Sequence, residues 1–179
     1  MKKSLLFTLR LLPLFLFGIV LLLSGCGYKF GSLMHPQVKS IAVAPVVNET
    51  RYFNLSSQVR SLLAESFQVD GSLKLTNESK ADCIIYSRIL KAEFKDMYFT
   101  ENDANLEDEF TPRQWRVVLT IEFTVMIPGS AEPLIAKQTV LGSTDFMAKG
   151  DLENSRRNAL KQAALAASRL VVSSVTENW

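Results

Sequence analysis

Residues 115–127 read WRVVLTIEFTVMI, and an apolar side chain occupies every odd position of this stretch. The even positions are mixed, and Arg116, Thr120, Glu122 and Thr124 among them are polar. Strict alternation with a period of two predicts a β-strand that is buried on one face only. The stretch therefore predicts a sheet that packs against the core with one face and is partly wet on the other.

Other segments of the chain also have strand character. Residues 40–47 predict a first strand, with Pro45 near its end or on a sheet edge because proline has no backbone N–H. Residues 73–76 predict a short strand and residues 82–99 a long one, and after a Pro-Gly-Ser turn residues 133–144 return as a partner strand. One face of the long strand is expected to carry Ile84, Tyr86, Arg88, Leu90, Ala92, Phe94, Asp96 and Tyr98.

Two segments follow the helical period instead. Asn54 is a candidate N-cap for a helix that runs to about Val69, where Asp70-Gly71 ends it. Asp151 is the candidate N-cap of a second helix, in which small alanines allow close approach to the sheet. The inward stripe of the first helix is Leu55, Val59, Leu62, Leu63 and Phe67, and that of the second is Leu152, Ala159, Ala163, Ala167, Leu170 and Val171.

The order of these segments, β-α-β-β-β-β-α with the second strand short, predicts an α+β fold. We expect a two-layer sandwich in which two helices pack on one face of a mostly antiparallel four-stranded sheet with long central strands. Residues 39–179 are long enough to form this single domain with its own core.

The N-terminal segment has the features of an export signal. It begins Met1-Lys2-Lys3, and its clean apolar run from residue 11 to residue 23 is 13 residues long, about 20 Å as a helix. This is shorter than the roughly 30 Å hydrocarbon core of a membrane, so a cleaved signal peptide over residues 1–25 is favoured over a membrane anchor.

The residues before the expected cleavage point, Leu23-Ser24-Gly25-Cys26, resemble the lipobox of bacterial lipoproteins. This resemblance implies cleavage between Gly25 and Cys26, a diacylglyceryl thioether on the cysteine sulfur, and an acyl chain such as palmitate on the new amino group. The alternative is an ordinary signal peptide with an incidental cysteine. Glycine rather than aspartate at position 27 is typical of export to the outer membrane in the known enterobacterial sorting scheme.

The mature chain would have no strong charge. Removal of residues 1–25 lowers the 20 basic residues to 17, against 18 acidic ones, so a nucleic-acid partner is not expected. Residues 26–38 form a lipidated tether, and its stretch of 11 residues from 27 to 37 spans at most about 40 Å. Cys83, the one cysteine left beside Cys26, is expected to be a buried small hydrophobe rather than a reactive thiol.

Candidate residues for catalysis are missing from the predicted domain. The single histidine, His35, lies in the tether, and no hydrolase, zinc or nucleotide-binding motif occurs. Residues 101–109 carry five acidic side chains but lack the spacing and glycine of a calcium loop, so a solvated loop tip is the better interpretation. We expect no enzyme activity, no metal and no cofactor.

The long strands are expected to expose cations, namely Arg88, Lys91, Lys95, Arg113 and Arg116. They can be ordinary solvated side chains on a wet sheet face. They can also form a surface for a barrel protein or an anionic amphiphile, whose phosphates would pair with the cations.

Several short motifs resemble one family. Residues 26–30, CGYKF, are similar to the start of the mature chain in the lipopolysaccharide-assembly lipoprotein family LptE. Residues 41–50, IAVAPVVNET, are similar to a strand and turn of that family, and so are Ala81-Asp82 and the alanine-rich C-terminal helix. The likeness spans the whole mature chain.

The resemblance implies a lipoprotein of the cell outer membrane, facing the periplasm, that sits in the lumen of the LptD β-barrel. There it would act as plug and assembly factor and bind lipopolysaccharide through basic side chains on the sheet, for which Arg88 and Lys91 are the candidates. The alternative is a periplasm-facing lipoprotein regulator or secretion accessory, such as an activator of peptidoglycan synthases. Such an activator usually carries a long spacer, and the short tether here favours the barrel.

Overall fold

The computed structural model describes residues 37–97, 114–147 and 151–177 of the 179-residue chain. The predicted signal peptide, Gly25, Cys26, the tether up to residue 36 and the acidic loop at 101–109 lie outside the described residues. The strands are β1 (Ser40–Val43), β2 (Val47–Asn48), β3 (Lys74–Leu75), β4 (Cys83–Met97), β5 (Gln114–Met126) and β6 (Pro133–Met147). The helices are α2 (Leu55–Asp70), a 3₁₀ turn at Glu78–Lys80, and α3 (Leu152–Thr176).

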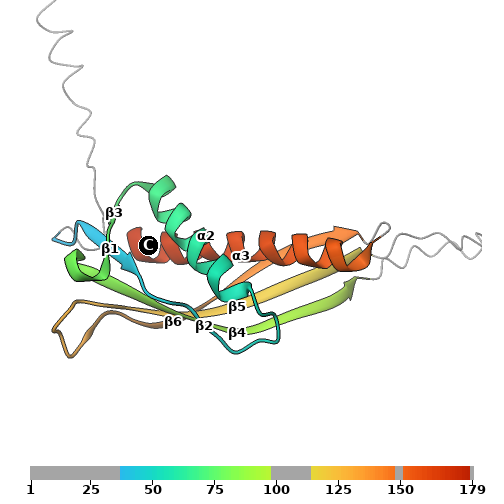
Figure 1. The fold of residues 1–179 in the computed structure, drawn as a ribbon, viewed down its shortest axis with the longest axis horizontal. Coiled ribbons are helices and arrows are strands. Elements are labelled where there is room, and N and C mark those ends of the chain that lie inside the picture. The colour runs from blue at the N-terminus through green and yellow to red at the C-terminus, as the bar shows by residue number, and fades with distance from the viewer. Residues whose placement is uncertain (1–36, 98–113, 148–150, 178–179) are drawn as a thin grey trace, which may run out of the picture. The chain divides into compact units, whose positions relative to one another are not determined.

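One mixed sheet holds all these strands, and α2 and α3 cover one of its faces (Figure 1). The order across the sheet is β3-β1-β4-β5-β6, with β2 also paired to β4. The α+β class with two helices is confirmed, whereas the prediction of four mostly antiparallel strands is wrong. Six strands are present, and the β1–β3, β1–β4 and β2–β4 pairings are parallel. Only β4–β5 and β5–β6 are antiparallel within the described residues.

Pro45 accounts for part of this difference. It lies between β1 and β2 and divides the predicted strand 40–47 into two short strands, which both pair with β4. Proline cannot donate to a sheet ladder, so the ladder is interrupted at this position. The flanking amides of Ala44 and Glu49 still reach the carbonyls of Ile85 and Ile89, at 3.1 and 3.0 Å.

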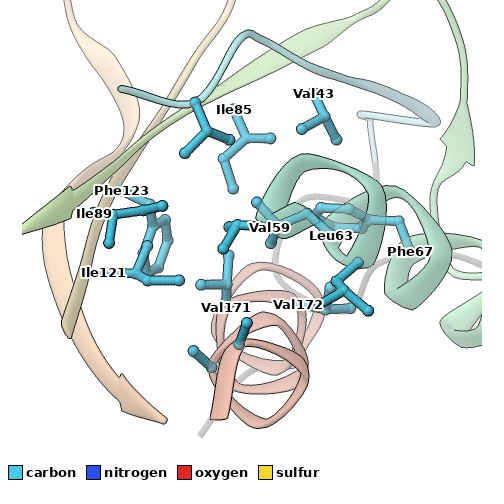
Figure 2. Close-up of a cluster of buried hydrophobic side chains, with 14 of the residues drawn as sticks. Val43, Val59, Leu63, Phe67, Ile85, Ile89, Ile121, Phe123, Val171 and Val172 are labelled. Carbon is cyan, nitrogen blue, oxygen red and sulfur yellow. The ribbon is translucent and has the colours of Figure 1, made fainter. Parts of the chain in front are cut away.

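The core lies between the sheet and the two helices (Figure 2). The odd-numbered side chains of β5 from Val117 to Val125 are fully or almost fully buried, as the alternation at 115–127 predicted. They meet the alanine stripe of α3 at Ala163 and Ala167, while α2 contributes Val59, Leu63 and Phe67. Leu170 was expected in the α3 stripe, but it is 47% exposed and does not belong to the core.

The helix ends follow local chemistry. Asp151 caps α3, because its carboxylate accepts hydrogen bonds from the amides of Glu153 and Asn154 at 2.9 and 3.1 Å. Asn54 occupies the N-cap position of α2 as predicted, although its side chain makes no capping hydrogen bond. Gly71 ends α2 with φ of 72°, a conformation that favours glycine.

A β-bulge at Leu90 changes the face on which the side chains of β4 lie. The pairing with β5 shifts between Ile89 and Lys91. Before the bulge Ile85 and Ile89 are buried under the helices, and after it Ala92 and Phe94 pack against the same core. The expectation that residues 84 to 98 follow one uninterrupted register is therefore wrong.

Candidate functional site

The bulge brings the two predicted lipopolysaccharide-binding residues to one face. Residues three apart on a regular strand lie on opposite faces. With the extra residue at Leu90, Arg88 pairs with Glu122 and Lys91 with Thr120, and both positions face away from the helices. We call this face the open face; its charged members are Arg88, Lys91, Glu93, Lys95, Arg116, Glu122, Lys137 and Asp145.

Arg88 is tied to the turn that follows β2. Its guanidinium lies 2.9 Å from Glu49 Oε1, and both side chains are about half exposed. Asn48 fixes the turn, because its Oδ1 accepts from the Thr50 amide at 3.0 Å and the Thr50 hydroxyl at 2.8 Å. Its Nδ2 donates to the Tyr52 carbonyl at 2.8 Å. The Asn-x-Thr motif at residues 48–50 thus positions Glu49 beside Arg88.

Other cations of the open face are also paired. Arg116 makes a two-pronged contact with Asp145 at 2.5 and 2.8 Å, and these hydrogen bonds raise the pKa of Arg116 and lower that of Asp145. Lys137 lies 3.1 Å from Glu122. Lys91 and Lys95 form no ion pair within the described residues, so their charge is the most available to a ligand.

Apolar side chains lie among these charges. Tyr86 and Leu141 are 46% and 59% exposed on the open face, and Val47 and Met147 are also exposed there. Cations interleaved with exposed apolar side chains suit an amphiphile that carries both anionic groups and hydrocarbon.

The structure describes part of the chain on which the predictions about metal binding, the cysteine thiol and membrane spans depend. No group of three or more possible metal ligands occurs within the described residues. Cys83 is buried as expected, and desolvation, with the nearby Asp82 charge, raises its pKa to about 11. In the part of the chain that the structure describes, no helix is long and apolar enough to cross a membrane.

Sequence reasoning missed some members of the open face. Glu49 and Val47 were assigned to a turn and a strand without a role, although Asn-x-Thr was a visible signal for a built turn. Cys26, Gly25 and Arg113 lie outside the described residues.

A family model described as LptE, lipopolysaccharide-assembly, matches residues 38–174. The chain belongs to the LptE family. Members of this family are non-enzymatic lipoproteins that serve lipopolysaccharide assembly. The match covers every described strand and helix except the last residues of α3. No curated protein sequence matches the chain.

Solved structures share the fold at low sequence identity. A protein from Xanthomonas campestris has a TM-score of 0.52 and 12% identity, over 79% of this chain and 86% of its own. A PelC dodecamer from Paraburkholderia phytofirmans has a TM-score of 0.51 and 10% identity, over 83% and 95%. A minor lipoprotein from Acinetobacter baumannii has a TM-score of 0.50 and 9% identity, over 78% and 93%. At these identities the likeness concerns the fold alone.

Proposed function

We propose that this LptE-family protein is an outer-membrane lipoprotein that plugs an LptD-like β-barrel and assists lipopolysaccharide transport to the cell surface. The observation that carries the proposal is the family match over residues 38–174. In this proposal the domain is a rigid, catalytically inactive wedge within the barrel lumen.

The proposed anchor is Cys26. Cleavage after Gly25 would leave its sulfur and amino group for acylation, and several acyl chains bind a membrane almost permanently. Residues 27–37 would then hold the domain within about 40 Å of the bilayer. This distance suits an integral membrane partner better than one deep in the periplasm.

The proposed lipopolysaccharide surface is the open face around Arg88 and Lys91. Both are cations on the sheet face that the helices leave uncovered, with Tyr86 and Leu141 exposed on the same face. Phosphate and carboxylate groups would bind the cations, while acyl chains would lie on the apolar side chains. Lys91 forms no ion pair with described residues. Arg88 would have to exchange its ion pair with Glu49 for one with an anionic group of lipopolysaccharide.

Co-purification from detergent-solubilised outer membranes tests the barrel complex. The wild-type lipoprotein is expected to elute with a large β-barrel partner. A photocrosslinker at Thr120 on the open face and another at Lys161 on α3 would map which surfaces contact the barrel. Crosslinks at both positions to a soluble peptidoglycan synthase alone would contradict the proposal and favour a periplasmic regulator.

Lipopolysaccharide retention tests the proposed contacts. Arg88→Gln and Lys91→Gln are each expected to weaken binding by at least about tenfold, the value of one charge-assisted hydrogen bond. Lys161→Gln removes an equal charge from α3 and is the matched control. Equal losses in all three variants would indicate a general charge effect. They would contradict the proposal that Arg88 and Lys91 contact lipopolysaccharide.

A further inference from the structure

The helix side of the sheet is not covered equally along its length. The 16 residues of α2 extend about 24 Å, whereas the 15 residues of β4 extend about 50 Å. Figure 1 shows that α3 runs further along the sheet than α2. Near the Met97 end of β4, the structure has a cavity of about 450 Å³ beside the first turns of α3.

Aromatic rings and one guanidinium line this cavity. The Arg156 guanidinium lies 5.6 Å from the ring centre of Phe94 and 5.3 Å from that of Trp115. Phe94 also contacts Tyr52 at 5.9 Å and Phe146 at 6.1 Å between ring centres. The rings hold Arg156 in place through cation–π contacts, and no acidic side chain pairs with it within the described residues.

Two buried hydrogen-bond donors at the cavity have no acceptor. They are Trp115 Nε1 and Arg156 Nε, and the two other such atoms in the described chain are serine hydroxyls, of Ser66 and Ser87. A buried donor without a partner costs about 1–3 kcal/mol, so native proteins rarely leave two at one place. Both nitrogens are covered in this structure, so an acceptor in the adjoining cavity would reach them after a small movement of the Arg156 or Trp115 side chain.

A second cation reaches the cavity from the turn after β2. Arg51 lies 5.7 Å from the ring centre of Tyr52, and both residues line the cavity. The Asn48 amide holds this turn through the Tyr52 carbonyl. Glu93 and Lys95 of β4 also line the cavity, although their pairing with Val118 and Arg116 places both on the open face. Their opposite charges offset each other at the rim, so Arg51 and Arg156 leave the cavity lining with a net positive charge.

We infer that this cavity, the Arg156 site, binds a phosphate-type oxyanion. Its oxygens would accept from Trp115 Nε1 and Arg156 Nε, and Arg51 would neutralise the remaining charge. The two arginines and the rings of the site differ from Arg88 and Lys91, although Glu93 and Lys95 of the open face reach its rim. The site does not depend on the barrel proposal. The same chemistry is offered by free phosphate and by the headgroup of a phosphorylated amphiphile, whose hydrocarbon the aromatic rings would contact.

The test uses the ¹⁵N indole signal of Trp115 in the mature lipoprotein held in non-ionic micelles. Trp115 and Trp179 are the two tryptophans of the chain, and Trp179→Phe leaves a single indole signal. The probes are inorganic phosphate and dodecyl phosphate at fixed ionic strength, with dodecyltrimethylammonium as the cationic control. A saturable shift with phosphate identifies a free anion as sufficient, and a shift with dodecyl phosphate alone identifies a lipid-type headgroup.

Variants decide whether the shift comes from the Arg156 site. Arg156→Gln is expected to weaken binding by at least about tenfold, the value of one charge-assisted hydrogen bond. Arg157→Gln, the exposed neighbour outside the cavity lining, is the charge-matched control and is expected to bind like wild type. If Arg156→Gln unfolds the protein, Arg51→Gln tests the same site, because Arg51 also lines the cavity and is expected to bind the anion.

The inference is overturned by the absence of a saturable shift with both phosphate probes, or by an equal shift with the cationic amphiphile. Equal weakening by Arg156→Gln and Arg157→Gln overturns it too. Loss of the barrel partner, or of binding through Arg88 and Lys91, would leave these measurements unchanged, so failure of the two proposals can be told apart.

Discussion

Glu49 pairs with Arg88, the proposed lipopolysaccharide contact, and would compete with a ligand for its charge. Their contact of 2.9 Å is half exposed, and such pairs are worth about 0.2–1 kcal/mol. We therefore predict that Glu49→Gln strengthens lipopolysaccharide retention by about twofold to fivefold at low salt. Retention is measured on immobilised protein as salt is raised.

The double variant Glu49→Gln with Arg88→Gln separates this effect from a general change in net charge. It is expected to show no gain over Arg88→Gln alone, because the cation that Glu49 occupies is then absent. A gain of the same size in both backgrounds would mean that Glu49 acts only through net charge.

Gly142 allows α3 to pack closely on β6. A Cβ at this position would lie 2.2 Å from the Ala163 carbonyl oxygen and 2.4 Å from the Ala167 backbone nitrogen. Backbone atoms cannot move aside as a flexible side chain can, so Gly142→Ala is expected to lower the free energy of unfolding by about 3 kcal/mol. Urea unfolding measures this loss. Ser143→Ala, on the exposed neighbouring position, is the control, and a similar small loss in both variants would contradict the prediction.

Cys83 is a chemically inert thiol in the folded protein. Its side chain is buried, and its pKa of about 11 leaves fewer than about one thiolate in a thousand near neutral pH. In a Cys26→Ser variant, where Cys83 is the sole cysteine, we predict no maleimide labelling at pH 7 until denaturant unfolds the chain. Rapid labelling without denaturant would show that this end of β4 opens.

At the level of single residues, the sequence could suggest cations that face solvent but not how they are grouped. Arg88 and Lys91 were chosen as basic residues of the long strand on the strength of the family resemblance. Strict alternation would have placed them on opposite faces, because the bulge at Leu90 has no signal in the sequence. Arg156 was missed because one arginine in a helix has no pattern of its own. Its cavity depends on Trp115 and Phe94, which come together only through the antiparallel pairing of β4 with β5.

Among the elements, Asp82 joins the starts of β1 and β4. Its carboxylate accepts from the amides of Lys39 and Ser40 at 3.0 and 2.9 Å and from the Ser40 hydroxyl at 2.8 Å. The Ser40 hydrogen bond is the largest cause of the lowered pKa of Asp82. This gives a structural role to the Ala-Asp strand start, one of the motifs on which the resemblance to the LptE family was based.

The lowered pKa predicts how this junction responds to acid. Since the folded chain holds the Asp82 proton less tightly than the unfolded chain, the stabilisation is complete above the unfolded pKa of about 4. It is lost as the pH falls through the still lower folded pKa. Asp82→Asn is therefore expected to be less stable than wild type near neutral pH, with the difference shrinking below about pH 4.

Thermal unfolding followed across pH measures this difference. Glu78→Gln removes another exposed carboxylate nearby, from the 3₁₀ turn, and is the control. A stability gap between Asp82→Asn and wild type that stays constant down to strongly acidic pH would show that the carboxylate charge is not involved.

The elements that could be predicted from the sequence are those with one face buried along most of their length. Strand β5 was predicted closely because its helix-facing side is buried along nearly its whole length, which forces a clean period of two. The bulge in β4 was missed because Leu90 is apolar and fits either register. The parallel pairings of β1, β2 and β3 were missed because strands of two to four residues are too short to show a clear periodicity, and their partners are chosen by tertiary contacts.

For the whole molecule, the buried core cluster of the described residues runs from Val38 to Val175. It lies entirely within the region that the family model matches, apart from its last residue. Within the described residues the core therefore begins at Val38, the last residue of the predicted tether, and we propose that residues 1–36 serve export and anchoring.

This division predicts that a chain beginning at Gln37 folds with the same unfolding midpoint as the full lipoprotein but does not stay with membranes. Circular dichroism in urea and flotation with outer-membrane vesicles measure the two properties. Cys26→Ser in the full chain is the matched comparison, since it removes only the acylation site and is expected to float as poorly as the truncated chain. A truncated chain that unfolds much earlier would place part of the core in the tether. Flotation of Cys26→Ser at the wild-type level would mean that the domain binds the membrane or its barrel without lipid, and the acyl chains would then be dispensable for placing it.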